Sequence, residues 1–139
     1  MTKVDFYILS DSGAVARSHF ACRLADKAFN AGHRVYIHTS DEASAAALDE
    51  QLWTFRPQSF LPHGRLGSEN AELVGIGYGD DPAEHNDVMI NLDLAVPDFV
   101  GRFSRVLEVV VPDPQLRDPL RENYRFYADR GYPLTNKRL

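Results

Sequence analysis

The residue pattern with the clearest chemical potential is a basic stripe near the C-terminus. When this segment is drawn as a helix, four side chains fall within about a quarter-turn of one another: Arg117, Arg121, Tyr124 and Arg125. Three guanidinium groups with an interleaved phenol suit a site that binds carboxylates and an aromatic side chain. A solvated helix surface would show the same residues, and on the residues alone the two interpretations have equal weight.

A second pattern is an aromatic cluster in the middle of the chain. Trp53 and Phe55 are followed by Phe60, which stands just before Leu61 and Pro62. Aromatic side chains near a helix end and a proline turn are most often part of a core, yet such clusters also anchor protein interfaces. Both roles stay open at this point.

The glycine pattern argues against a nucleotide site. The turn after the first predicted strand, residues 10–13 (SDSG), has a single glycine and matches neither the GxGxxG nor the GxxxxGK[ST] motif. The glycine-dense run at residues 75–79 continues a strand into Asp80 and Asp81, which is acidic where a phosphate needs positive charge. We predict a bent edge strand there.

Metal and nucleophile chemistry also find little support. None of the five histidines (His19, His33, His38, His63, His85) is paired at the i, i+4 spacing of a helical metal site, and Cys22 is the single cysteine. We therefore expect no metal, no cofactor and a packing role for Cys22. The sequence also lacks the Gly-x-Ser-x-Gly nucleophile elbow, so we expect no catalytic site.

Alternating strands and helices must position these residues. Strands are predicted at residues 4–9, 34–38, 59–61, 73–77, 87–92 and 106–111, and helices at 14–31, 42–53 and 112–130. Thr39 and Glu42 have capping-box spacing before the second helix, and the polar segment 63–72 is the candidate mobile loop. Near-continuous apolar strands separated by helices are typical of a mostly parallel sheet covered on both faces. We predict an α/β fold, a single Rossmann-like three-layer domain over residues 1–139 without a phosphate-binding loop.

Composition places the chain among ordinary globular proteins, with 44% hydrophobic and 25% charged residues. No apolar run approaches the roughly 20 residues that a membrane span needs, and a lone cysteine fits a reducing compartment, so we predict a cytoplasmic protein without membrane contact. The net charge is −5, but residues 117–139 hold six Lys/Arg against three Asp/Glu. This basic end could steer an anionic partner to an otherwise acidic protein.

Four segments together resemble a known family. They are residues 4–9 (VDFYIL), 48–53 (LDEQLW), 59–63 (SFLPH) and 121–125 (RENYR). Their order and spacing are similar to those of the chi subunit of bacterial DNA polymerase III holoenzyme, and the resemblance covers essentially the whole chain.

The resemblance implies a non-catalytic accessory of the clamp-loader complex in DNA replication. Chi subunits pair with the psi subunit and grip the acidic C-terminal tail of single-stranded DNA-binding protein, so they meet DNA only indirectly. By position, the tail site would comprise Arg117, Arg121, Tyr124 and Arg125, with Val110 as a wall of the apolar pocket. Trp53 and Phe60 would lie in the region that meets psi.

Two other functions remain as alternatives. One is a nucleotide-dependent enzyme on the same Rossmann-like fold. The other is direct binding of single-stranded DNA through the basic helix, which the acidic remainder of the chain disfavours.

Overall fold

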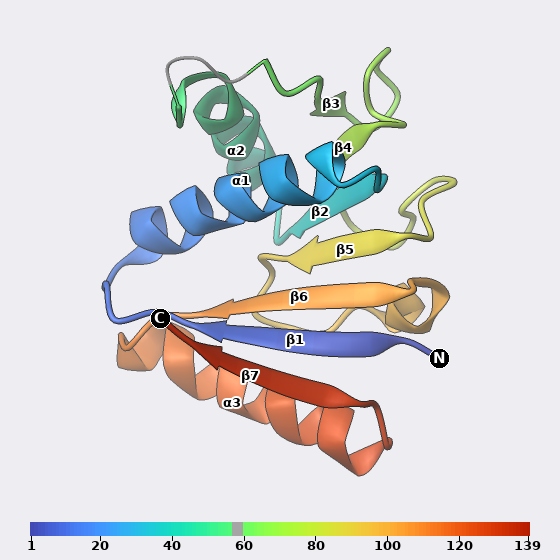
Figure 1. The fold of residues 1–139 in the computed structure, drawn as a ribbon. Coiled ribbons are helices and arrows are strands. Elements are labelled where there is room, and N and C mark those ends of the chain that lie inside the picture. The colour runs from blue at the N-terminus through green and yellow to red at the C-terminus, as the bar shows by residue number, and fades with distance from the viewer. Residues whose placement is uncertain (57–59) are drawn as a thin grey trace.

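The computed structural model describes residues 1–56 and 60–139, which form one seven-stranded sheet with helices on both faces (Figure 1). The strands are β1 Lys3–Ile8, β2 Val35–Thr39, β3 Gly64–Arg65, β4 Val74–Tyr78, β5 Val88–Asn91, β6 Arg105–Val110 and β7 Leu134–Arg138. The helices are α1 Ala14–Asn30, α2 Glu42–Thr54, α3 Pro114–Asp129 and the short 3₁₀ helix η1 Asp98–Arg102. The strand order is β3-β4-β2-β5-β6-β1-β7, and every pairing is parallel.

The layers follow from the apolar residues that alternate across the strands. Helices α1 and α2 cover one face of the sheet, and α3 covers the other (Figure 1). The core under α1 and α2 includes Ile37, Ile76 and Val109, whereas the core under α3 includes Phe6 and Tyr127. Burial on both faces explains why the central strands read as continuous apolar runs. The predicted Rossmann-like three-layer fold is confirmed.

Two strands escaped prediction because they are short or polar. β3 has two residues, and β7 (LTNKR) lies at the edge of the sheet with four of its five residues exposed. An edge strand can remain polar because only one of its sides pairs, so β7 shows no apolar run. The predicted strand at 59–61 is wrong for Phe60 and Leu61, which lie outside any strand, while residue 59 is outside the described residues.

The structure corrects the expected cap of α2 and adds detail to the segment 63–72. Asp41, not Thr39, caps α2, because Asp41 Oδ1 accepts a hydrogen bond from the Ser44 N–H at 2.8 Å. Thr39 Oγ1 instead donates to the Gly77 carbonyl on β4 at 2.9 Å. The segment 63–72, the candidate mobile loop, has no regular structure apart from the two-residue β3, although His63 and Ala71 are buried, and its mobility stays a prediction.

The glycines of β4 are explained by close packing above the strand. A Cβ on Gly77 would lie 2.6 Å from a methyl carbon of Leu66 and 3.0 Å from the Tyr36 hydroxyl oxygen. A Cβ on Gly75 would lie 2.5 Å from the Ala71 carbonyl oxygen. Because β4 pairs with both β3 and β2, the expected edge position is wrong, and these glycines make room for side chains instead.

Candidate functional site

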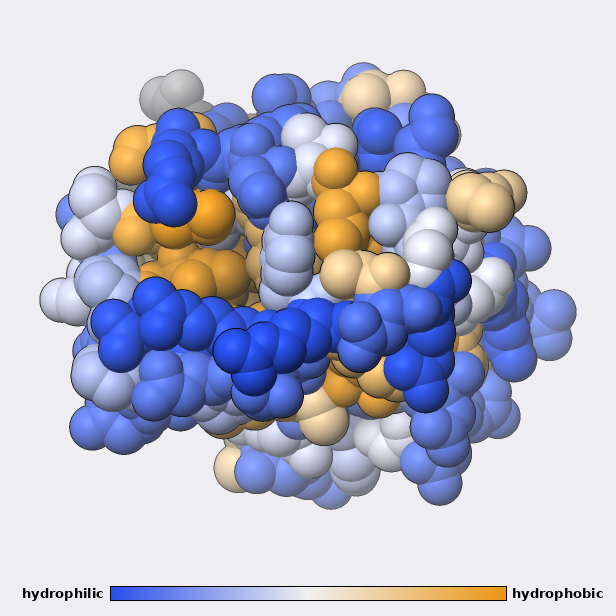
Figure 2. Space-filling view, turned by 90° about the horizontal axis from the view of Figure 1, so that it is seen from below, coloured by the Kyte–Doolittle hydropathy of each residue, from blue (hydrophilic) through white to orange (hydrophobic). Residues whose placement is uncertain are grey.

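A pocket of about 380 Å³ lies on the α3 side of the sheet, at the carboxyl ends of β1 and β6. It is lined by Phe6, Ile8, Leu9, Val110, Val111, Pro112, Arg117, Leu120, Arg121, Tyr124, Asn136 and Arg138. Figure 2 views the molecule from the side of α3 and β7 and shows a strongly hydrophilic band beside hollowed hydrophobic patches. The pocket thus combines an apolar floor with a basic rim.

Three of the four residues of the predicted basic stripe line this pocket, and the fourth does not. Arg117 and Arg121 line it together with Tyr124, whereas Arg125 is not among the lining residues. The Arg125 side chain is 70% exposed and forms an ion pair with Glu122 one turn back on α3. Arg125 therefore belongs to the solvated surface that the sequence left as an alternative.

The charges at the rim are only partly compensated. Arg117 Nε lies 3.3 Å from Asp118 Oδ1, in a pair whose carboxylate is 63% exposed. Within residues 1–56 and 60–139, neither Arg121 nor Arg138 forms an ion pair with a carboxylate. Two guanidinium groups are thus available to an anion that enters the pocket.

The floor is shaped by one aromatic contact. The Tyr124 ring stands edge-on to the Phe6 ring with centroids 5.1 Å apart, and Val110 is half-buried beside them. The Asn136 side-chain amide donates to the Tyr124 hydroxyl oxygen at 3.4 Å. Such a floor suits the insertion of one more aromatic ring.

Sequence reasoning missed Asn136 and Arg138 as pocket residues. They lie on β7, which pairs with β1 in parallel, and this pairing brings the C-terminus beside residues more than 120 positions earlier. The basic pair Lys137-Arg138 was the available signal, but its place depends on a strand that the pattern did not predict.

Trp53 and Phe60 are surface residues. The Trp53 side chain is 65% exposed and its ring lies 4.4 Å from that of the buried His63, while Phe60 is 92% exposed. A core role for these two residues is therefore excluded. Large exposed aromatic side chains near each other in sequence are typical of an interface.

The usual nucleotide site of this fold, at the carboxyl ends of the strands, is occupied by the protein's own groups. The Gly13 N–H at the start of α1, where a phosphate would be bound, donates to Asp113 Oδ1 at 2.8 Å. The buried Arg17 donates to the carbonyl oxygens of Val109 at 2.8 Å and Leu92 at 2.9 Å.

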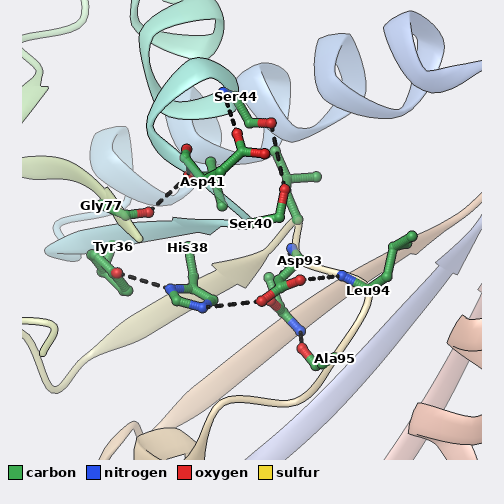
Figure 3. A network of polar contacts seen from close by, with 12 residues as sticks. Tyr36, His38, Ser40, Asp41, Ser44, Gly77, Asp93, Leu94 and Ala95 are labelled. Atoms are coloured by element: carbon green, nitrogen blue, oxygen red, sulfur yellow. Dashed lines mark hydrogen bonds and ion pairs between the residues drawn. The ribbon is translucent and has the colours of Figure 1, made fainter. Parts of the chain in front are cut away.

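A further polar network joins Tyr36 and His38 of β2 to Asp93, which follows β5 near the carboxyl ends of the strands (Figure 3). The Tyr36 hydroxyl oxygen lies 3.0 Å from His38 Nδ1, and Asp93 Oδ2 lies 3.6 Å from His38 Nε2. Burial lowers the pKa of His38 although Asp93 opposes the shift, so the imidazole is neutral at pH 7. These side chains bind one another and leave few free donors for a phosphate.

We therefore expect isothermal titration of the protein with ATP and magnesium to give no heat of binding. The reason is that Asp113 places a carboxylate where the phosphate would accept its first backbone hydrogen bond. A saturable micromolar signal that is lost on substitution within residues 10–13 would contradict this and favour the nucleotide-dependent enzyme.

The structure offers no support for Cys22 as a nucleophile or for a metal site among the described residues. Cys22 is fully buried, and burial raises the pKa of its thiol to about 12, so it is a packing residue as predicted. In the part of the chain that the structure describes, no three His, Cys, Asp or Glu side chains are grouped so as to hold a metal ion.

No helix among the described residues is long and apolar enough to cross a membrane.

Glu108 is a buried acid under α3 that the sequence did not single out. Its Oε2 accepts hydrogen bonds from the Tyr127 hydroxyl at 2.7 Å and the Asn91 amide at 2.9 Å. Desolvation raises the pKa of Glu108 to about 7 in spite of these bonds and of the charge of Arg17. Glu108 thereby joins β6 to α3 and β5.

This pKa gives the unfolding free energy a defined pH dependence. Between the ordinary glutamate pKa near 4.5 and about 7, native Glu108 keeps a proton that the unfolded chain has released, so stability falls as pH rises. Relative to Glu108→Gln, the wild-type protein should lose up to about 3 kcal/mol between pH 5 and 8. Urea unfolding of both proteins across this range measures the difference, and parallel pH profiles would contradict the expected ionisation.

The comparisons with known proteins decide the family. The family model described as DNA polymerase III chi subunit, HolC, matches residues 1–135. The chain belongs to the chi subunit family of DNA polymerase III. It is 48% identical over 140 residues to the DNA polymerase III subunit chi of Pseudomonas aeruginosa, covering 100% of this chain and 98% of that protein.

Two further relatives are more distant and cover nearly as much. The chain is 30% identical over 137 residues to the chi subunit of Haemophilus influenzae, covering 96% of this chain and 95% of the relative. It is also 30% identical over 142 residues to that of Escherichia coli, covering 97% of each. Full-length likeness to chi subunits connects the chain to DNA replication, as the resemblance implied.

Proposed function

We propose that this chi-family protein is a non-catalytic accessory of the clamp-loader complex that bridges the psi subunit and the C-terminal tail of single-stranded DNA-binding protein. The observation that carries the proposal is the pocket under α3, where Arg121 and Arg138, which form no ion pair within the described residues, and Arg117 surround an apolar floor. A disordered tail that ends in acidic residues, a phenylalanine and a free carboxylate has the complementary chemistry.

The tail would bind in two ways at once. Its carboxylates pair with the guanidinium groups of Arg117, Arg121 and Arg138, while its phenylalanine ring enters the apolar floor beside Val110 and Tyr124. Ordering the tail costs entropy, so a single contact is weak to moderate and becomes weaker as salt screens the arginines. Several tails on an oligomeric partner raise the avidity.

The second partner would use the exposed aromatic pair. Trp53 at the end of α2 and Phe60 in the following segment offer the large apolar side chains that anchor protein interfaces. We assign this surface to psi, because it is separate from the tail pocket and its two main side chains are aromatic and not basic.

The positions of the two surfaces favour simultaneous binding. Helix α2 packs on β4 and β2 near one edge of the sheet, whereas the pocket lies beside β7 at the opposite edge. From β2 to β7 there are four strand spacings, roughly 19 Å at about 4.8 Å each. A partner on one surface therefore leaves the other open.

Titration of a fluorescent tail peptide with the full chain tests the anion site. We expect saturable binding that disappears when the terminal phenylalanine is removed and weakens with salt. Binding of single-stranded oligonucleotide in place of the peptide would instead favour a direct DNA binder.

A further inference from the structure

The tail pocket is continuous with an unpaired strand edge. β7 forms the last strand of the sheet and pairs with β1 alone, over five residues in unbroken register. The strand contains no proline and no bulge to blunt its free side. Asn136 and Arg138 of this strand also line the pocket.

The backbone groups that point away from β1 can be assigned from the ladder. The Pro133 carbonyl accepts from the Val4 N–H at 2.9 Å, and the Leu139 N–H donates to the Ile8 carbonyl at 3.0 Å. Because residues of a parallel strand alternate between neighbours, the N–H and C=O groups of Leu134, Asn136 and Arg138 face outward. Within the described ranges, no other backbone group forms a hydrogen bond with these outward-facing groups.

The chemistry beside this edge selects one kind of strand. Arg138 lies on the α3 side, and Lys137 lies on the α1 side, where its Nζ is 3.4 Å from the Tyr7 hydroxyl oxygen. Neither basic group has an ion-pair partner in the described parts of the chain. An acidic strand complements these two cations.

We propose that the acidic segment preceding the anchored phenylalanine adds to β7 as an eighth, parallel strand. This inference rests on the proposed tail binding and extends it along the sheet. The pocket lies at the carboxyl end of β7, so a tail whose last residue is held there runs back along the strand toward Leu134. At about 3.3 Å per residue, β7 accommodates roughly five residues before the anchor.

Two synthetic peptides with the same terminal phenylalanine test the added strand. One has about four residues and fills the pocket, and the other extends about eight acidic residues further. We expect the longer peptide to bind about tenfold more tightly, because it gains backbone hydrogen bonds as well as charge contacts. Hydrogen exchange of the Asn136 and Arg138 amides should slow with the longer peptide only.

Two variants of one residue separate backbone pairing from charge. Because Asn136 also lines the pocket, the gain from peptide length is measured in each variant as the ratio of the affinities for the long and the short peptide. Asn136→Pro removes an outward N–H and should abolish this gain, whereas Asn136→Ala removes only the side chain and should keep it. A length gain that survives Asn136→Pro, or unchanged amide exchange in the wild-type protein, would overturn the added strand while tail binding stands. Failure of both peptides to bind would overturn the proposed function as well, and slow exchange without peptide that depends on protein concentration would assign the edge to self-association.

Discussion

Arg121→Glu is expected to weaken binding of the single-stranded DNA-binding protein tail by about 50-fold or more while the protein stays folded. Arg121 lines the pocket and has no carboxylate partner within the described residues, so its charge is available to the tail. Reversal places a carboxylate against the acidic peptide and leaves the peptide's own carboxylate unpaired. Fluorescence anisotropy measures the affinity, and circular dichroism checks the fold.

Arg125→Glu provides the matched control on the same helix. This substitution changes the net charge by the same amount as Arg121→Glu, but Arg125 lies outside the pocket and forms an ion pair with Glu122. Only its long-range field acts on the peptide, and salt screens this effect, so we expect a loss of about threefold or less at physiological ionic strength. Equal losses for both variants would mean that the basic helix acts through its total charge and that the pocket assignment is wrong.

Phe60→Ala is expected to lower affinity for the psi subunit by about 30-fold or more without changing tail binding. With 92% of its surface exposed, Phe60 contributes little to the protein's own core, so its apolar area is available to a partner. The free energy of unfolding should change by less than about 0.5 kcal/mol. Co-purification with psi and urea unfolding measure the two quantities.

The neighbouring Leu61 separates binding from folding. Leu61 is 4% exposed and packs in the core under α1 and α2, so Leu61→Ala should cost about 2 to 4 kcal/mol of stability. At temperatures where that variant remains folded, it should still bind psi. If Phe60→Ala destabilised the fold to a similar degree, or lost both partners together, its assignment to an interface would fail.

The central strands were predictable because each is buried on both faces. β2 and β5 are fully buried, and such strands carry continuous apolar runs whatever lies beside them. β7 was not predictable in this way, since its partners are on one side only and its residues are mostly polar. Asn136 and Arg138 therefore could not be placed at the pocket until β1 and β7 were seen to pair.

The basic stripe shows what helical spacing can and cannot resolve. Periodicity placed Arg117, Arg121 and Arg125 on one side of α3, but it carries no information on where the neighbouring strands end. The pocket lies at the carboxyl ends of β1 and β6, which takes in the first two arginines and excludes the third. Likewise, the pattern at Trp53 and Phe60 fitted both core and surface, and only the packed structure distinguishes them.

Assembly of all three proteins tests the bridging function most directly. Size-exclusion chromatography with light scattering would be run on psi, this chain and full-length single-stranded DNA-binding protein. The two surfaces lie near opposite edges of the sheet, so we predict one complex containing all three proteins. Psi should join it only when this chain is present, and Arg121→Glu should release the DNA-binding protein while retaining psi. Displacement of one partner by the other, or a complex of psi with the DNA-binding protein that does not need this chain, would contradict the account.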